Sequence, residues 1–470
     1  MAGRPAARTA LKHLQRAAAA LQQGKAQAAM REARLALKAD PAAIDARAIL
    51  GIAQVQAGAA EAGLADLEVA LAARPRDPQL LFNLGHAQSI AGRDAAARKS
   101  FEAALNIDPG NLPARMNLAH LHLKADDPKQ AGMAFRAALN GAPSMVEAHL
   151  GLGLALQQQH RLEEAERSFA EALRLAPDHP QALMNLGNLL IDAGRPAEAR
   201  PLLEAAARLP GATGDAWCNL AVAAYDLGDL DAALQDLDEA LDRRPGHTRA
   251  LATRMIVLDE LGRHDEARAL ADPALVERHR LPQIDNAALT DFALNHPTLV
   301  EARSGKTTMM GQQTAQLHHG ESPALDLLLQ AVEEAGSAYR AARCPDPAHP
   351  FLAHPPDRWQ IVPWITVLRE AGHQESHNHP SGWLSGVYYV AAPGIRSDDN
   401  ARTGWLELGR PHARFQARHL PALDHVCPEP GLLVLFPSYA WHKTVPFAGT
   451  APRISIAFDL VPVDGMAAGS

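Results

Sequence analysis

The stretch SMVEAHLGLGLALQQQHRLEEAERSFAEALRLAP, residues 144–177, contains one complete copy of a pattern that determines how the first half of the chain folds. A small residue, Gly153, is followed by Ala165, then by the bulky Phe169 and by Ala172, and a proline ends the stretch. Small residues let two helices approach closely, and a bulky apolar residue fills the space between them. The stretch therefore predicts two antiparallel helices.

The same pattern recurs every 34 residues. Prolines close successive units at Pro41, Pro75, Pro109, Pro143 and Pro177, and small residues recur at Gly51, Gly85, Ala119, Gly153, Gly187 and Ala221. Two sets of positions with one period predict a solenoid of stacked helix pairs. These units resemble the tetratricopeptide repeat, with about seven to eight repeats between residues 8 and 272. We assign residues 1–274 to this all-α solenoid.

The first helix of each repeat forms the inner, concave surface of such a solenoid, which implies docking of a protein or peptide partner. Four repeats place asparagine at one equivalent position of this helix, at Asn83, Asn117, Asn185 and Asn219, whereas Gly151 interrupts the row. A side-chain amide both donates and accepts hydrogen bonds, so the row could pair with the backbone of an extended peptide. The alternative, that asparagine is simply common at this position, stays open.

Composition narrows the functional classes. With 470 residues, of which 47% are hydrophobic, the chain is long enough for two cores. The net charge is −8 and neither half is basic, so we expect no nucleic-acid partner. No apolar run reaches the ~18 residues of a membrane-spanning helix, and we expect no membrane partner. The three cysteines have no disulfide or metal spacing, which favours a reducing, cytoplasmic location.

The second half, residues 275–470, has a different pattern. Short apolar, β-branched and aromatic runs alternate with turn signals, as in WLSGVYYVAAPG, GLLVLFPS and RISIAFDLVPV. Many short strands predict a sandwich or small barrel of the jelly-roll type.

Three histidines and an arginine in this half suggest a metal site. Residues i and i+2 of a strand face the same way, so His377 and His379 are expected to present two imidazoles on one strand face. His442 follows a strand and a Pro-Ser turn and is a candidate third ligand, while Arg453 and Ser455 share a face of the next strand. A guanidinium beside a metal suits a dicarboxylate co-substrate, because it pairs with a carboxylate through two hydrogen bonds.

Residues 280–463 resemble an iron(II)/2-oxoglutarate-dependent oxygenase domain with the signature HxHPxxxLSGVYYV, LFPSxxxHxxxP and RxSIAF. The resemblance implies a double-stranded β-helix, the jelly-roll or cupin-like fold, that uses Fe(II), O₂ and 2-oxoglutarate. Carried over by position, His377, His379 and His442 match the metal ligands, Arg453 matches the residue that binds the distal carboxylate of 2-oxoglutarate, and Ser455 and Tyr389 match positions that assist it. We expect an oxygenase that hydroxylates a protein or peptide recruited by the solenoid.

The ligand set and the reaction each leave room for a second interpretation. The commonest facial triad contains a carboxylate, so Glu375 competes with His379 for the third ligand position. A three-histidine site is also compatible with a dioxygenase that needs no 2-oxoglutarate, although Arg453 argues against it. The substrate could be a small molecule instead of a peptide, and an inactive domain could serve as a scaffold.

Overall fold

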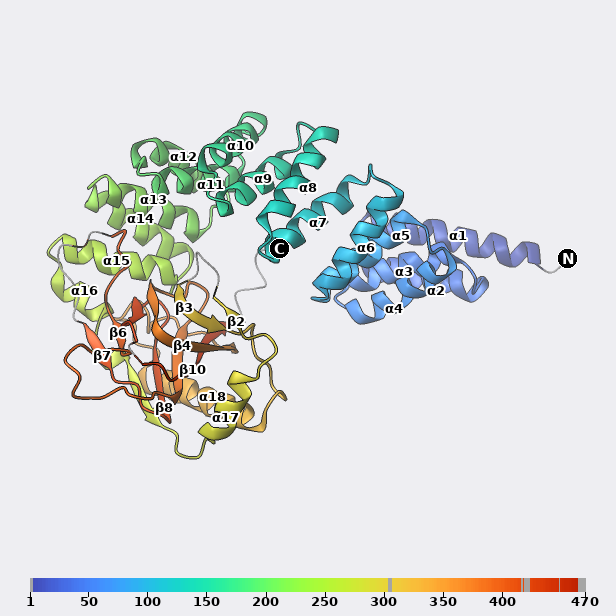
Figure 1. Ribbon diagram of the computed structural model, residues 1–470. Coiled ribbons are helices and arrows are strands. Elements are labelled where there is room, and N and C mark those ends of the chain that lie inside the picture. Colours follow the sequence, from blue (N-terminus) through green and yellow to red (C-terminus); the bar gives the residue numbers. More distant parts are fainter. Residues whose placement is uncertain (1–2, 303–306, 416, 418–422, 448, 464–470) are drawn as a thin grey trace. The chain divides into compact units, whose positions relative to one another are not determined.

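The computed structural model describes residues 3–302, 307–415, 417, 423–447 and 449–463 (Figure 1). The chain divides into two compact units, Met1–Leu189 and Leu190–Ser470. In its described residues, from residue 3 on, the first unit contains helices as its only regular elements, and the second unit contains the remaining helix pairs and a sheet domain. Within the described residues, no helix is long and apolar enough to cross a membrane.

From residue 3 to residue 270, the described chain forms sixteen helices in eight consecutive antiparallel pairs. Their bounds are α1 (Gly3–Gln22), α2 (Ala26–Ala39), α3 (Ile44–Gln56), α4 (Ala60–Ala73), α5 (Pro78–Ile90), α6 (Asp94–Ile107), α7 (Leu112–Lys124), α8 (Pro128–Gly141), α9 (Val146–Gln158), α10 (Leu162–Leu175), α11 (Pro180–Asp192), α12 (Pro196–Arg208), α13 (Gly214–Asp226), α14 (Leu230–Arg243), α15 (Thr248–Glu260) and α16 (His264–Leu270). From α3 to α15, the first helices of successive pairs begin 34 residues apart. The period read from the sequence is therefore the structural repeat.

Close packing of small and bulky residues holds each pair together. A Cβ atom added at Gly153 would lie 2.3 Å from the ring of Phe169, and one added at Gly85 would lie 2.8 Å from the ring of Phe101. Both phenylalanine side chains are fully buried. This arrangement confirms the packing that the sequence predicts for residues 144–177.

Local capping sets the helix ends. Before α5, the carboxylate of Asp77 accepts hydrogen bonds from the backbone N–H groups of Gln79 and Leu80, which have no partner within the helix. Pro78 occupies the first turn, where its missing N–H costs nothing. After α5, Gly92 takes a φ of 72°, a left-handed conformation that glycine adopts without strain.

In its described residues, the sheet domain contains ten antiparallel strands and two helices, of 9 and 21 residues. They are β1 (Glu277–Arg280), α17 (Asn286–Leu294), β2 (Val300–Glu301), β3 (Thr308–Gln313), α18 (Pro323–Arg343), β4 (Trp359–His377), β5 (Leu384–Ala391), β6 (Leu406–Leu408), β7 (Asp424–Val426), β8 (Leu432–Pro437), β9 (His442–Thr444) and β10 (Arg453–Pro462). The strand order is β1-β8-β5-β10-β4-β9-β6-β7, with β3 beside β4 and β2 beside β3. The curled, non-sequential order confirms the predicted jelly roll.

Two strands position the candidate site. β10 lies between β4 and β5 at the centre of the sheet, and its residues alternate between the two faces. Met309 of β3 pairs with His373 of β4, and Gly311 pairs with Leu368. Several residues of β4 therefore lie opposite the single residue Met310, and this irregularity forms a β-bulge. Ala371 takes a φ of 61° there, and a Cβ on Gly372 would lie 2.8 Å from the carbonyl oxygen of Met310. The bulge changes which side chains of β4 face the site.

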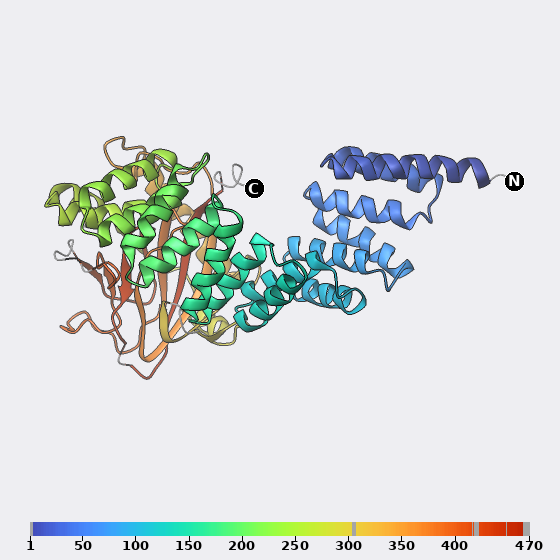
Figure 2. The ribbon, with the colours of Figure 1, turned by 90° about the horizontal axis from the view of Figure 1, so that it is seen from above.

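The last helix pairs share one hydrophobic core with the sheet domain, and both belong to the second compact unit. Figure 2 shows α15 and α16 against the strands. Three buried hydrogen bonds between described residues connect them: Thr248 Oγ1 donates to the carbonyl of Gly382 at 3.1 Å, Trp441 Nε1 to that of Ala252 at 3.3 Å, and Tyr439 Oη to that of Leu270 at 2.8 Å. The predicted division after residue 274 therefore marks a change of secondary structure inside a continuous core.

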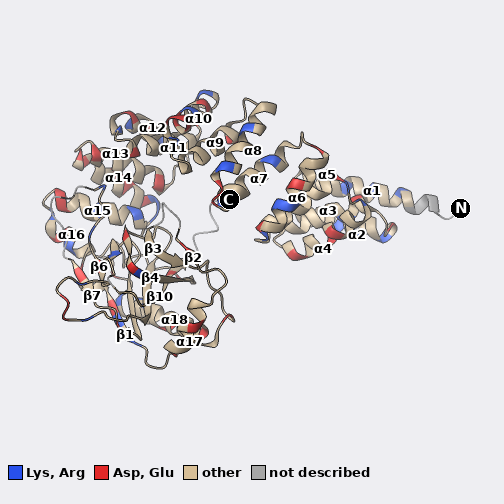
Figure 3. Cartoon of the chain, viewed as in Figure 1, with Lys and Arg blue, Asp and Glu red and all other residues tan. Residues whose placement is uncertain are grey.

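Charged residues of both signs alternate along the helices (Figure 3). Some pair within one helix, as Arg200 does with Glu204 of α12 at 3.2 Å. Surface pairs of this kind contribute about 0–1 kcal/mol each to stability.

Candidate metal centre

Adjacent strands bring two of the predicted ligands together. His377 is the last residue of β4, His442 is the first residue of β9, and the two are directly paired across the strands. Their ring centroids lie 4.3 Å apart. This neighbour relationship joins two segments that are far apart in the sequence.

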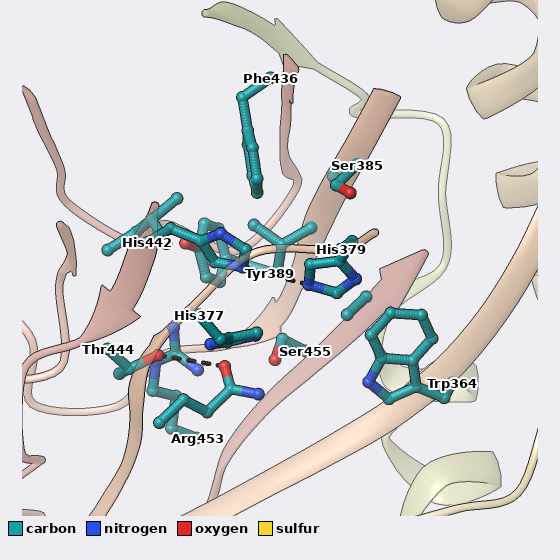
Figure 4. Close-up of a pocket in the computed structure, with 15 residues that line it drawn as sticks. Trp364, His377, His379, Ser385, Tyr389, Phe436, His442, Thr444, Arg453 and Ser455 are labelled. Atoms are coloured by element: carbon teal, nitrogen blue, oxygen red, sulfur yellow. Dashed lines mark hydrogen bonds between the residues drawn. The ribbon is translucent and has the colours of Figure 1, made fainter. Parts of the chain in front are cut away.

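The third histidine reaches the same point from outside the strand. His379 lies two residues after the end of β4, so the expectation that it shares a strand face with His377 is wrong. Its backbone N–H instead donates to the carbonyl of Ser438 at 2.9 Å. The imidazole nevertheless faces His442, with 3.3 Å between the two Nε2 atoms (Figure 4).

Hydrogen bonds at Nδ1 orient the rings. His377 Nδ1 donates to the carbonyl of Glu375 at 2.7 Å, and His442 Nδ1 donates to that of Ala440 at 3.0 Å. A carbonyl only accepts, so Nδ1 carries the proton and Nε2 is left as a free ligand atom. The ligand atoms of the three histidines lie within 4.8 Å of one another. Two nitrogens bound to a metal at ~2.1 Å are separated by roughly 3.0–3.4 Å, which matches the His379–His442 distance.

Burial favours the neutral form of the His377 and His442 imidazoles. Loss of solvation, followed by the neighbouring His379, lowers the pKa of His377 to about 4. Burial also lowers the pKa of His442 well below 6.5. Neutral imidazole is the form that ligates a metal, and it suits iron, zinc, copper and nickel. The three residues therefore fit a divalent transition metal.

Glu375 does not join the three histidines. Its carboxylate is 60% exposed and accepts a hydrogen bond from His373 at 3.1 Å. The β4–β9 register shifts between Gln374 and His377, so the alternation that would align Glu375 with His377 is broken. Within the described part of the chain, the three histidines are the group that could hold a metal.

A buried cation lies in the same cavity. The side chain of Arg453, on β10, is 2% exposed, and its Nε donates to the carbonyl of Gly404 at 3.1 Å. Burial lowers the pKa of this guanidinium. No carboxylate pairs with it among the residues that the structure describes. An unpaired buried cation is costly, so its position favours an anionic ligand.

Two further predicted residues line this cavity. The ring of Tyr389 lies 5.1 Å from the Arg453 guanidinium, and its buried hydroxyl has no hydrogen-bond partner among the described residues. Burial raises the pKa of this hydroxyl to about 12, so it is a neutral donor. Ser455 is buried beside it and pairs across the strands with Tyr389. The predicted co-substrate residues are thus assembled at one end of the histidine cavity.

The structure adds residues that the sequence did not single out. Asp459 accepts a hydrogen bond from His379 Nδ1 at 2.9 Å, and Trp364 stacks on the His379 ring with centroids 5.6 Å apart. The sequence could have indicated Asp459, because it lies on β10 an even number of residues from Arg453 and Ser455 and so faces the same side of the strand. Trp364 carried no comparable signal, because a tryptophan in a strand is usually core.

Known protein families match both halves of the chain. The family described as "Putative 2OG-Fe(II) oxygenase" matches residues 363–459, and tetratricopeptide-repeat models match residues 116–180, 152–216, 184–248, 89–132 and 224–287. The chain contains tetratricopeptide repeats followed by a domain that matches this oxygenase family. The predicted resemblances are confirmed, and the oxygenase family implies Fe(II), 2-oxoglutarate and O₂.

Solved structures similar to this chain are repeat proteins. A tetratricopeptide repeat protein from Parabacteroides merdae is 16% identical, covers 53% of this chain and 99% of its own, and has a TM-score of 0.43. TTC0263 from Thermus thermophilus is 24% identical, covers 39% of this chain and 99% of its own, and has a TM-score of 0.33. YrrB, described as having an unusual peptide-binding site, is 22% identical, covers 40% and 97%, and has a TM-score of 0.35. No curated protein matches the sequence.

The repeats place the predicted asparagines in two different settings. Asn83, Asn117 and Asn185, here called the asparagine row, lie on α5, α7 and α11 and are half-buried. Asn219 on α13 is 4% exposed, and its Oδ1 accepts a hydrogen bond from Arg249 at 2.7 Å. Asn219 is thus buried and engaged within the protein. In the asparagine row, Asn83 Oδ1 accepts an exposed hydrogen bond from Gln79 at 3.1 Å, but the row is accessible and is the part of the prediction that a peptide could use.

Proposed function

We propose that the protein is an iron(II)- and 2-oxoglutarate-dependent oxygenase that hydroxylates a protein or peptide. The observation that carries this proposal is the unpaired, buried Arg453 in the same cavity as three inward-facing Nε2 atoms. A metal site alone would not require a buried guanidinium. A dicarboxylic co-substrate that reaches both the metal and the guanidinium explains why they share one cavity.

Each residue of the cavity has a role in this proposal. His377, His379 and His442 would hold iron(II) through Nε2. Arg453 would bind the distal carboxylate of 2-oxoglutarate, with the Tyr389 hydroxyl donating a further hydrogen bond to it. When bound, iron(II) with 2-oxoglutarate and O₂ supplies oxidative decarboxylation, which yields succinate and CO₂ and hydroxylates the substrate.

The surrounding side chains exclude water from the reacting groups. The cavity wall includes the apolar side chains of Val387, Leu406 and Phe436, and the last two are buried. A dry wall strengthens the interaction of Arg453 with a carboxylate, because electrostatic attraction grows as the local dielectric constant falls. The protein therefore supplies orientation and electrostatics, while the metal supplies the oxidising chemistry.

A protein or peptide substrate is supported by the repeats. Their recurring first helices carry the asparagine row, whose amides can pair with an extended backbone. The last helix pairs also share one hydrophobic core with the oxygenase domain. A repeat array of this kind is a docking surface for proteins or peptides, which supports such a substrate over a small molecule that needs the cavity alone.

Succinate formation tests the proposal. Purified protein is loaded with Fe(II) without oxygen and supplied with 2-oxoglutarate, then exposed to O₂ with and without a cell-extract peptide mixture. We expect succinate to form in proportion to 2-oxoglutarate consumed, faster with peptides, and peptides heavier by one oxygen atom. His442→Ala is the control that should form none. Absence of succinate from the loaded wild-type protein would favour a scaffold or a dioxygenase that needs no 2-oxoglutarate.

A further inference from the structure

Within the oxygenase domain, a series of hydrogen bonds links the His379 ring to Asp459, Ser385 and Ser438. His379 Nδ1 donates to Asp459 Oδ2 at 2.9 Å, and Ser385 Oγ donates to Asp459 Oδ1 at 2.6 Å. Ser385 Oγ in turn lies 2.8 Å from Ser438 Oγ. Both oxygens of Asp459 are therefore engaged, and the carboxylate has a fixed orientation.

Among the described residues, the His379 ring is the group able to carry a positive charge that contacts the Asp459 carboxylate. The carboxylate side chain is 13% exposed, and among the described residues no lysine or arginine pairs with it. A buried carboxylate is costly unless a positive charge lies nearby. Asp459 contacts Nδ1 of His379, and the other ring nitrogen of His379, Nε2, points to the shared centre of the three imidazoles. A cation bound at that centre would place a positive charge near Asp459 and reduce the cost of burying its carboxylate.

Three neutral imidazoles alone leave a divalent metal with its full charge. The commonest facial triad of this kind of metal site avoids this by using a carboxylate as one ligand. In this chain the corresponding position is a histidine, and a carboxylate lies directly behind it. A carboxylate that accepts from a ligating histidine fixes the ring orientation and raises the basicity of the ligand atom.

We propose that Asp459 is the carboxylate of this metal centre and acts through His379. It is a positioning residue: it orients the Nε2 of His379 toward the metal and supplies the negative charge that the three imidazoles lack. Ser385 holds Asp459 in the required orientation. This inference rests on the proposed metal site and adds to it the residue that replaces the missing acidic ligand.

Metal affinity measured without turnover tests the inference. Wild type, Asp459→Asn, Asp459→Ala and Ser385→Ala are titrated with Fe(II) under nitrogen, and the Fe(III)/Fe(II) potential of each loaded protein is measured. The asparagine keeps the hydrogen-bond acceptor and removes the charge. Because loss of such a partner costs roughly 10–100-fold in metal affinity, we expect about 10-fold weaker binding for Asp459→Asn and up to about 100-fold for Asp459→Ala. Loss of the negative charge should also raise the potential.

Controls separate this inference from loss of the fold and from failure of the metal site. Asp357→Asn changes an exposed carboxylate of the same domain and should bind Fe(II) like wild type. Melting of the metal-free proteins shows whether each variant folds; if Asp459→Asn does not, Ser385→Ala carries the test and should bind several-fold more weakly. Wild-type affinity and potential in the folded variants would overturn the role of Asp459. Failure of the wild-type protein to bind Fe(II) would overturn the metal site itself.

Discussion

Replacing Arg453 with leucine should separate co-substrate binding from metal binding. The guanidinium is 2% exposed and has no carboxylate partner in the described part of the chain, so 2-oxoglutarate would be its counter-ion. Truncating one partner of a buried charge pair costs about 2–5 kcal/mol, which corresponds to a loss of affinity from about 30-fold to about 4,000-fold. Fe(II) affinity should stay at the wild-type value, because none of the three histidines contacts Arg453.

The stability of the same variant provides a second, opposite readout. An unpaired buried cation destabilises the free protein, and replacement of buried charges by apolar side chains is often neutral or stabilising. Without co-substrate, Arg453→Leu should therefore melt at the wild-type temperature or above it. With saturating 2-oxoglutarate, wild type should gain stability that the variant does not.

The assay is titration of 2-oxoglutarate into the Fe(II)-loaded protein under nitrogen, followed by the metal-to-ligand absorbance. Arg453→Lys is the matched control, since it keeps the charge but loses the two-point pairing, and its affinity should fall between wild type and the leucine variant. An unchanged 2-oxoglutarate affinity in Arg453→Leu would exclude Arg453 as the carboxylate-binding residue and favour a three-histidine dioxygenase that needs no such co-substrate.

The remaining predictions concern the repeats and their junction with the oxygenase domain. Phe169→Ala should lower the free energy of unfolding by about 3–5 kcal/mol in urea titrations, because it empties a fully buried site, whereas exposed Met133→Ala should change it by under about 0.5 kcal/mol. Replacing all three members of the asparagine row with alanine should raise KM for a long peptide about 10- to 2,000-fold at unchanged kcat, given about 0.5–1.5 kcal/mol per hydrogen bond. Asn140→Ala, on a second helix, is the control, and equal KM values for the triple variant and wild type would favour a small-molecule substrate. A fragment of residues 275–470 should melt at least about 5 °C below one of residues 190–470, because it loses three buried hydrogen bonds and exposes part of the core; equal melting would show that the junction contributes nothing.

The features that sequence predicted well are those that local rules determine. Each repeat buries its bulky residue against the small residue of its own helix pair, so the 34-residue period of Gly153 and Phe169 carries the fold directly. The histidines and Arg453 could be predicted because they lie on or beside neighbouring strands. Their segments follow one another in the fixed order of the sequence motif.

The features that sequence did not predict depend on irregular backbone or on distant partners. The β4–β9 register shifts between Gln374 and His377, the segment that contains Glu375, and β4 ends at His377, before His379. Strand alternation alone predicts neither the shift nor the strand end. Asp459 reaches His379 across 80 residues of sequence. Arg249 engages Asn219 from the next repeat, so the equivalent asparagines have different surroundings.

Anomalous diffraction at the iron edge, from crystals grown under nitrogen with Fe(II) and 2-oxoglutarate, would locate the metal and the co-substrate in one measurement. We expect one iron peak within roughly 2.0–2.3 Å of the Nε2 atoms of His377, His379 and His442, with the far carboxylate of 2-oxoglutarate on the Arg453 guanidinium. An iron peak at Glu375 and His373, or 2-oxoglutarate bound away from Arg453, would contradict the proposed centre.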